Sequence, residues 1–311
     1  MGSRAGGDQP LKDVVLAVSL GYNYRQLSPF VRSLKETGYD GDIVLYAAGT
    51  DSETTRRLRS EGVIVRRFLY PFKNCNKLRN PLHRCWPYVR PLAAAVKTPD
   101  AMHYLCILFQ NLSIMRYFLY RRFLRASKGV YRNVFLTDLR DVYFQGNPFH
   151  RMEGRQLKVF VEETWLTQGA DVNSSRWLRD LYGEEMVTLL ADKLLICSGT
   201  TLGDYDSICE YLDTFLLSLP EARSVMRMGL DQGIHNYLIY TGKLKDVTLY
   251  PNRTSEVLTM GLIRPTEKLP CNEKGQFVDA NGVPYAVIHQ FDRHEELAGR
   301  IRERYETGAV Y

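Results

Sequence analysis

The sequence predicts an α/β protein with a mixed, mostly parallel central sheet flanked by helices. Short apolar segments alternate with segments of helical periodicity, and short connections join them, which is the pattern of parallel strands linked by crossover helices. With 311 residues, 45% of them hydrophobic, the chain can bury a large core without disulfides. We expect residues 1–10 to be a flexible start and residues 11–311 to form a single domain.

The first part of the chain alternates strand and helix signals. The apolar run that ends at Gly21 predicts a buried strand. The next helix ends where glycines appear, at Gly38 and Gly41, and the helix after it begins at a capping residue, Asp51 or Ser52. We expect strands at 13–19, 42–48 and 63–69, with helices at 26–37 and 51–60.

Residues 70–101 are rich in Pro, Asn, Arg and Lys, which predicts a long loop or an irregular insertion. The segment 108–125 then predicts a strong helix that carries the densest positive charge of the chain: Arg116, Arg121, Arg122 and Arg125. These arginines indicate either the solvated face of an amphipathic helix or, for one of them, a position near an anionic diphosphate.

The remaining elements follow the same alternation. Apolar runs predict strands, and helical periodicity predicts helices between them. We expect strands at 133–137, 158–161, 194–198, 247–250 and 285–289, with helices at 177–191, 206–219, 230–240 and 293–305.

Charge and composition restrict the classes of partner. A net charge of +6 suits an anionic ligand such as a nucleotide diphosphate, and it is too modest to indicate a nucleic-acid binder. No apolar stretch is long enough for a membrane span, and no signal peptide is visible, so we expect the cytoplasm or, if the chain is truncated, the Golgi lumen. Six cysteines without a CxxC pair make a zinc site improbable; buried thiols are expected, with Cys75 and Cys85 the nearest pair for a disulfide.

Polar residues follow the first predicted strand, where the carboxyl ends of parallel strands place ligand sites. Gly21, Tyr22 and Asn23 stand there, and an aromatic ring beside an amide suits contacts with a base and a ribose. A plain Gly/Asn turn is the alternative.

Asp138 and Asp141 follow the predicted strand 133–137. Two carboxylates at the end of an apolar strand are costly unless they meet cations or hydrogen-bond donors. A divalent ion that bridges a diphosphate would meet this need, and oxygen ligands suit Mg²⁺ or Mn²⁺. The alternative is a structural network in which the two acids pair with Arg140 and its neighbours.

The predicted helix 230–240 begins with a polar group of residues. Asp231 and His235 share one face, and Gln232 and Asn236 share another, because residues four apart are neighbours on a helix. This pattern indicates a helix that lines a pocket, with an N-terminal cap at Asp231 as the alternative. His289 ends the last predicted strand; alone it would be a core residue, but beside two aspartates that lack a third ligand it suggests a metal ligand.

These segments, in this order, resemble GT-A glycosyltransferases. The stretch 135–149 (FLTDLRDVYFQGNPF) is similar to the strand, DxD motif and NPF of that group, and Asp231, Gln232 and Asn236 form a DQxxxN like that of several retaining families. The late His289 matches the metal-binding histidine of the group, and the segment 197–199 resembles the strand end that borders the sugar. The chain departs from the motif in having two residues between its acids.

The resemblance implies a Rossmann-like fold and transfer of a sugar from a nucleotide-diphosphate donor to a hydroxyl of a glycan or glycoconjugate. Residues 11–150 would bind the nucleotide and residues 151–311 the acceptor. Mn²⁺ or Mg²⁺ would be held by Asp141 and His289, with Asp138 acting on the ribose or through a water. Asp231, Gln232 and Asn236 would be catalytic. The implied donor-binding residues are Gly21, Tyr22, Asn23, Asp138, Arg140, Ser198, Gly199 and His235.

Several alternatives stay open at this stage. Retention of configuration is favoured, but inversion would need a base such as Asp231, Glu162 or Glu163. Trp86 and Trp165 are candidates either for stacking on the acceptor sugar or for the core. The rival functions are a domain that binds nucleotide or glycan without turnover, and a sugar-nucleotide pyrophosphorylase, although the latter would be expected to have a Gly-rich basic loop after its first strand.

Overall fold

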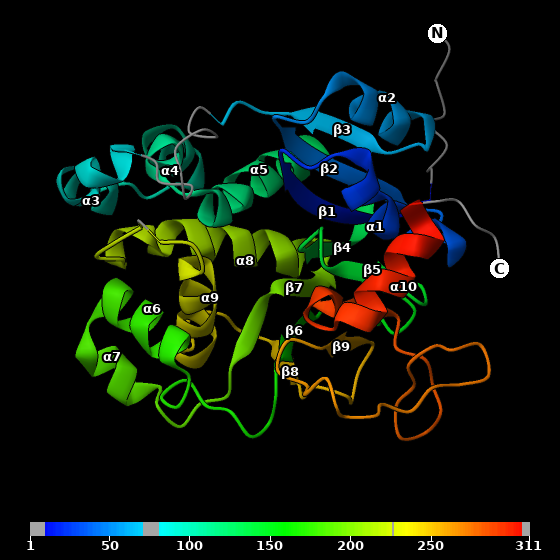
Figure 1. Cartoon of the computed structure of the whole chain (residues 1–311). Coiled ribbons are helices and arrows are strands. Elements are labelled where there is room, and N and C mark those ends of the chain that lie inside the picture. Colours follow the sequence, from blue (N-terminus) through cyan, green and yellow to red (C-terminus); the bar gives the residue numbers. More distant parts are fainter. Residues whose placement is uncertain (1–9, 71–80, 226, 307–311) are drawn as a thin grey trace, which may run out of the picture.

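The computed structural model describes residues 10–70, 81–225 and 227–306, and its centre is a seven-stranded sheet (Figure 1). The strand order is β3-β2-β1-β4-β7-β6-β8, and every strand runs in the same direction except β7, which is antiparallel to β4 and β6. The prediction of a mixed, mostly parallel sheet is therefore confirmed. The strands are β1 (Lys12–Leu20), β2 (Asp42–Ala48), β3 (Ile64–Arg67), β4 (Tyr131–Thr137), β6 (Leu157–Val161), β7 (Ile196–Asp204) and β8 (Val247–Tyr250).

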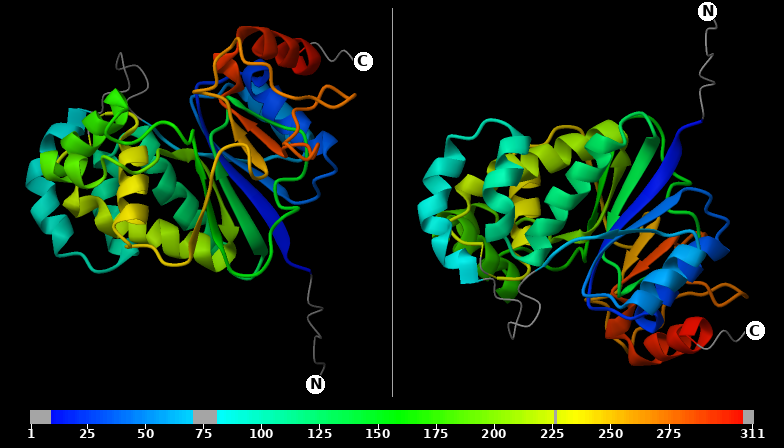
Figure 2. Two further views of the ribbon diagram at one scale, coloured as in Figure 1. Left: turned by 90° about the horizontal axis from the view of Figure 1, so that it is seen from below. Right: turned by 90° about the horizontal axis from the view of Figure 1, so that it is seen from above.

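Helices cover both faces of this sheet (Figure 2). The alternation of strand side chains explains why: in β1, Val14 and Leu16 join one buried cluster, whereas Val15 and Ala17 join the other. The first face carries α3 (Trp86–Ala94), α4 (Pro99–Cys106), α5 (Leu112–Ala126), α8 (Tyr205–Ser218) and α9 (Leu230–Tyr240), with α6 (Val172–Tyr182) and α7 (Glu184–Leu189) outside α9. The second face carries α1 (Tyr24–Glu36) and α2 (Ser52–Ser60), and α10 (Glu295–Glu306) packs on α1.

A second, three-stranded sheet lies beside the first. Its order is β5-β10-β9, with β10 antiparallel to β5 and parallel to β9. These strands are β5 (Val142–Phe144), β9 (Val257–Thr259) and β10 (Val287–His289). The described residues also form the 3₁₀ helices η1 (Pro81–Cys85), η2 (Ile107–Phe109), η3 (Leu219–Glu221) and η4 (Phe291–Arg293). The small sheet packs against α1 and α10, and it supplies one half of the candidate site.

Three expectations about the elements were wrong. The segment 81–101 is mostly helical: Pro87 and Pro99 stand in first turns, where no backbone N–H is needed, and α3 accommodates Pro91 in its interior. The helix expected at 177–191 is two helices separated at Gly183, whose φ of 95° breaks the helical path. The strand expected at 194–198 continues to Asp204, so that Gly199 stands inside β7 rather than at its end.

The cysteines and helices also bear on earlier expectations. All cysteines among the described residues are free thiols, and Cys85 and Cys271 are exposed rather than buried. Cys75, the proposed partner of Cys85, lies outside the described residues. None of the described helices combines the length and the hydrophobicity that a membrane span requires.

Candidate functional site

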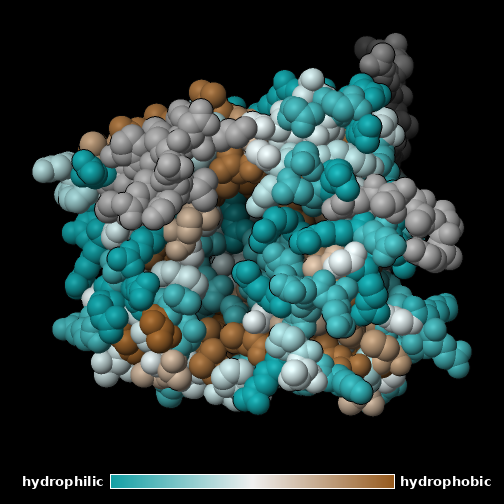
Figure 3. All heavy atoms as spheres, viewed as in Figure 1, coloured by the Kyte–Doolittle hydropathy of each residue, from teal (hydrophilic) through white to brown (hydrophobic). Residues whose placement is uncertain are grey.

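A cavity of about 390 Å³ opens beside the carboxyl ends of β1 and β4, between α5, α9 and the small sheet. In the space-filling view a hydrophilic hollow lies near the middle of the molecule (Figure 3). Many residues that the sequence singled out line this cavity: Tyr22, Arg116, Asp138, Arg140, Asp141, Ser198, Gly199, Asp231 and Gln232.

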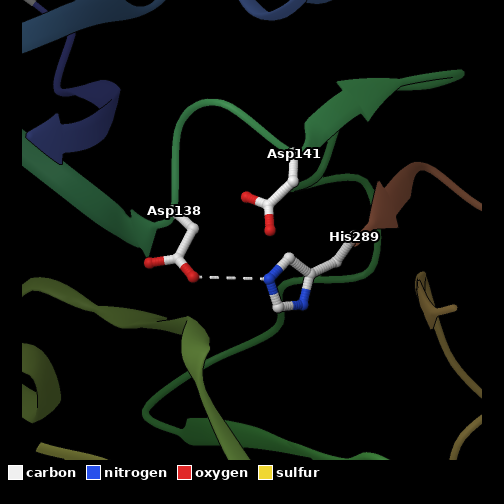
Figure 4. Close-up of side chains that lie close together, drawn as sticks. All are labelled: Asp138, Asp141 and His289. Atoms are coloured by element: carbon white, nitrogen blue, oxygen red, sulfur yellow. Dashed lines mark ion pairs between the residues drawn. The ribbon is translucent and has the colours of Figure 1, made fainter. Parts of the chain in front are cut away.

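Asp138, Asp141 and His289 converge from the two sheets (Figure 4). Asp138 follows β4, Asp141 precedes β5, and His289 ends β10, where it pairs with Val142. One potential ligand atom from each of the three residues lies within 4.8 Å of the others, and Asp138 Oδ2 is 3.5 Å from His289 Nε2. The extra residue between the two acids has a structural reason: the chain crosses from one sheet to the other here, and Leu139 is buried in the core as it does so.

The surroundings of this cluster fit a metal ion. His289 is fully buried; its Nε2 makes no hydrogen bond and has the Asp138 carboxylate 3.5 Å away, while Cys197 Sγ contacts its Nδ1 at 3.7 Å. A buried ring nitrogen that makes no hydrogen bond is costly unless it binds something. Gly199 keeps the space beside the cluster free of a side chain, since a Cβ there would lie 2.6 Å from Asp138 Oδ2 and 2.8 Å from His289 Nε2.

The two acids have opposite pKa shifts. Burial alone would raise the pKa of Asp138, but Arg116 and His289 outweigh burial and lower it. Burial raises the pKa of Asp141, and the neighbouring carboxylates of Asp138 and Asp292 raise it further, against the pull of His289. Burial and the neighbouring carboxylates therefore disfavour the charged form of Asp141, and a cation beside it would offset both effects.

Arg116 of α5 joins the metal cluster to α9. Its Nη1 donates to Asp138 Oδ1 at 2.5 Å and its Nη2 to Asp231 Oδ2 at 2.8 Å, and Nη2 also reaches the Ser198 carbonyl at 3.2 Å. Because Arg116 occupies Oδ1 of Asp138, it turns Oδ2 toward His289. Of the arginines noted on this helix, Arg116 is the one that lines the cavity.

The peptide 198–200 reaches the cavity through an irregularity in β7. Val159 of β6 pairs with Thr201, but the next residue, Phe160, pairs with Cys197, so the intervening residues bulge out of the ladder. Gly199 accepts a hydrogen bond from the Asp138 N–H at 2.8 Å, and the Ser198 hydroxyl donates to Asp231 at 3.2 Å. The bulge thus brings backbone and hydroxyl groups to the cluster.

The polar residues of α9 separate into two groups. Asp231 and Gln232 line the cavity, and Gln232 Nε2 donates to Glu162 Oε1 at 2.8 Å. His235 and Asn236 do not line it. His235 is fully buried against Tyr211, 2.7 Å from its hydroxyl, and burial lowers the His235 pKa to about 3.

The side chain of Asn236 makes its hydrogen bonds inside the protein. It donates to the carbonyls of Ile196 and Gln232, each at 2.8 Å, and accepts from the Ile196 N–H at 3.0 Å and from Gln168 Nε2. Neither His235, predicted to bind the donor, nor Asn236, predicted to be catalytic, lines the cavity.

The segment after β1 divides in the same way. Tyr22 lines the cavity, whereas Gly21 and Asn23 do not. Gly21 has a φ of 70° and donates to the Ala48 carbonyl, and Asn23 caps α1 with its side chain bonded to the Gln26 N–H. Gly21 and Asn23 therefore form the turn that was the alternative interpretation.

The two tryptophans named from the sequence differ in exposure. Trp86 is core, 1% exposed, with Nε1 donating to the Ala222 carbonyl at 2.9 Å. Trp165 is 64% exposed. Further residues that the sequence did not indicate also line the cavity, among them Trp177, Gln290 and Arg293. The only signal for the last two was their position just after His289.

No protein-family model matches the chain, and no curated protein sequence matches it. Solved structures with a similar backbone include an active-site mutant of LgtC, at 14% identity and a TM-score of 0.49, covering 96% of this chain and 97% of that one. Galactosyltransferase LgtC with donor and acceptor sugar analogues matches at 14% identity and a TM-score of 0.48, covering 95% and 94%. Core-mannan synthase A from Aspergillus fumigatus, in its Mn/GDP form, matches at 13% identity and a TM-score of 0.41, covering 80% and 74%.

Proposed function

We propose that this chain is a metal-dependent glycosyltransferase that moves a sugar from a nucleotide-diphosphate donor to an acceptor hydroxyl. One observation carries the proposal: Asp138 and Asp141, which cluster with the buried His289, line the same cavity as Arg116, Asp231 and Gln232. The first three offer a cation site, and the last three offer charged and amide groups beside it for the hydroxyls of a sugar. The order of the sequence motifs points to the same chemistry.

The ligand set favours a divalent ion that shares its shell with phosphate. Two carboxylates and one imidazole leave coordination positions for oxygens of a diphosphate, and this mixed set suits Mn²⁺ as well as Mg²⁺. When bound, the ion would neutralise the charge that develops on the departing diphosphate. Arg116 holds Asp138 in place for this role, so we regard Arg116 as a positioning residue.

The remaining groups can be assigned along the donor. Arg140 and Arg293 line the cavity and share the Asp292 carboxylate, at 2.8 and 3.9 Å. We assign these two cations to the phosphates. Tyr22 borders the same region, and its ring suits the nucleoside. Asp231, fixed by Arg116 and Ser198 through Oδ2, and Gln232 then face the sugar.

The proton chemistry favours retention of configuration. Among the described residues that line the cavity, Asp231 is the acid outside the metal cluster, and its carboxylate is already engaged by Arg116 and by the Ser198 hydroxyl. Glu162 is buried and already accepts from Gln232, and Glu163 is bound by Arg253 and Asn252. With no well-placed base, transfer of the acceptor proton to the departing phosphate is the simplest route.

The acceptor side is assigned to the second half of the chain. A cavity of about 500 Å³ lies next to Glu163 and Trp165, and the exposed Trp165 ring is suited to stacking on a sugar face. We propose a glycan or glycoconjugate hydroxyl as the acceptor.

The test is a panel of nucleotide sugars incubated with the protein and Mn²⁺, with release of the nucleoside diphosphate measured with and without chelator. We expect one donor to be hydrolysed in the presence of metal and none in its absence. Asp141→Ala should abolish this release, whereas Asp192→Ala, at an exposed aspartate that follows α7 and does not line the cavity, should not. Donor binding without any release would favour a binding domain, and formation of a nucleoside triphosphate from added pyrophosphate would favour a pyrophosphorylase.

A further inference from the structure

A second cavity, of about 550 Å³, lies between the end of β3 and the helix α5, away from the candidate active site. We call it the basic groove. Its floor is formed by Tyr46 and Phe123, and its rim carries two arginines and two leucines: Arg66, Arg122, Leu69 and Leu108. α5 separates the two cavities, since Arg116 faces the first and its neighbour Met115 faces the second.

The charges of α5 are distributed unevenly. Arg116, Arg121 and Arg125 form ion pairs with carboxylates, Arg121 with both Asp100 and Asp213. Arg122 forms no ion pair with an acid among the described residues, and the same holds for Arg66. Two uncompensated guanidinium groups on one groove attract an anion.

Both cations lie near a common point. The Arg66 guanidinium carbon is 5.8 Å from the centre of the Phe123 ring, and Phe123 is the neighbour of Arg122. Burial raises the pKa of Tyr46, and Arg66 and Arg122 both oppose that shift, which places both cations close to the phenol. Arg67 differs, because its head group turns to Thr55 of α2 at 3.5 Å.

Apolar side chains stand directly beside these cations. Leu69 is 85% exposed and Leu108 is 55% exposed, and both line the basic groove. Large apolar side chains that are exposed together and bordered by positive charge indicate a surface that binds a partner. The partner must present anionic groups next to an apolar layer.

We propose that the basic groove docks this protein on a bilayer that contains anionic phospholipid, with Arg66 and Arg122 on the lipid phosphates and Leu69 and Leu108 in the interfacial region. A bilayer matches both features at once, because its headgroups carry the negative charge and its acyl chains begin just below them. The proposal does not depend on the function proposed for the other cavity.

The test is sedimentation of the full chain with vesicles of phosphatidylcholine and phosphatidylserine, against vesicles of phosphatidylcholine alone. We expect binding to the anionic vesicles only. Each arginine near such a surface strengthens binding about fivefold, so the double variant R66A/R122A should weaken binding by roughly 30-fold. The matched control K274A/R302A removes the same net charge elsewhere and should weaken it by less than about threefold.

Two further variants define the groove. R66K/R122K keeps the charge and should retain most of the binding. Far-UV circular dichroism of every variant separates a binding defect from misfolding. L69S/L108S should weaken binding to anionic vesicles several-fold. The proposal is overturned if the wild-type chain ignores anionic vesicles, if both charge-removing doubles weaken binding equally, or if L69S/L108S binds like the wild type, which would indicate a site for phosphate groups alone.

Discussion

The first and second turns of α9 contain the same kinds of residue and have different roles. Asp231 and Gln232 in the first turn line the cavity, and their hydrogen bonds go to other side chains of the site. His235 and Asn236 in the second turn are buried, and Asn236 bonds to the backbone of β7. One helical turn thus separates residues that face a ligand from residues that hold the helix on the sheet.

The difference lies in where the polar atoms are satisfied. Asn236 makes hydrogen bonds with its oxygen and its nitrogen inside the protein, so it has little left for a ligand. A polar residue type at helical spacing therefore does not by itself identify a binding residue. If this comparison is correct, substitutions in the two turns should affect different measurements.

The largest expected effect is on stability, at the second turn. Asn236→Ala removes the side-chain bonds to the Ile196 N–H and carbonyl and to Gln168 in the interior, which should reduce the free energy of unfolding by about 3 kcal/mol. Urea unfolding measures this. Asn281→Ala, at an exposed turn, is the matched control and should change stability by less than about 0.5 kcal/mol. A stable Asn236→Ala protein with impaired turnover would restore Asn236 to the active site.

The next effect is on turnover, at the first turn. Gln232→Ala removes an amide that faces the cavity and should lower kcat by about 10- to 100-fold, with a stability loss of only about 1 kcal/mol from the lost bond to Glu162. The affinity for the free nucleoside diphosphate, measured by calorimetry, should stay unchanged. Equal losses of kcat and nucleotide affinity would place Gln232 at the nucleotide instead.

A third effect, which is absent at neutral pH and develops only on acidification, is a dependence of stability on pH, again at the second turn. Burial lowers the His235 pKa to about 3, so below its ordinary value of 6.5 the unfolded chain takes up a proton that the folded chain does not. The free energy of unfolding should therefore fall as the pH drops from 6.5 toward 3, by about 1.4 kcal/mol per pH unit from this residue. Comparing wild type with His235→Gln between these pH values isolates it; parallel curves would contradict the assignment.

Periodic segments made part of the fold predictable. The helix 230–240 and the strand 247–250 have the bounds that the sequence indicated, and Asp51 caps α2 as expected. The small sheet was largely missed, because β5 and β9 are three residues each and too short to show alternation. The reversal of β7 was also missed, because strand direction depends on long-range pairing.

Part of the candidate site was also predictable from the sequence. Asp138, Asp141 and His289 could be found because charged groups at the ends of apolar strands need an explanation, and these three do converge. The roles within the motif 231–236 could not be separated, since burial of His235 and Asn236 depends on β7 and α8, which are distant in sequence. Trp177 gave no signal, because α6 brings it to the cavity from a segment distant in sequence from the other site residues.

The most direct test of the account is Mn²⁺ binding, followed by calorimetry, with and without a nucleoside diphosphate. We expect the wild-type chain and the Asp192→Ala control to bind one ion, more tightly when the diphosphate is present, and Asp141→Ala and His289→Ala to lose that binding while unfolding at a similar urea concentration. Unchanged Mn²⁺ binding in both folded variants would contradict the metal site, and with it the proposed transfer chemistry.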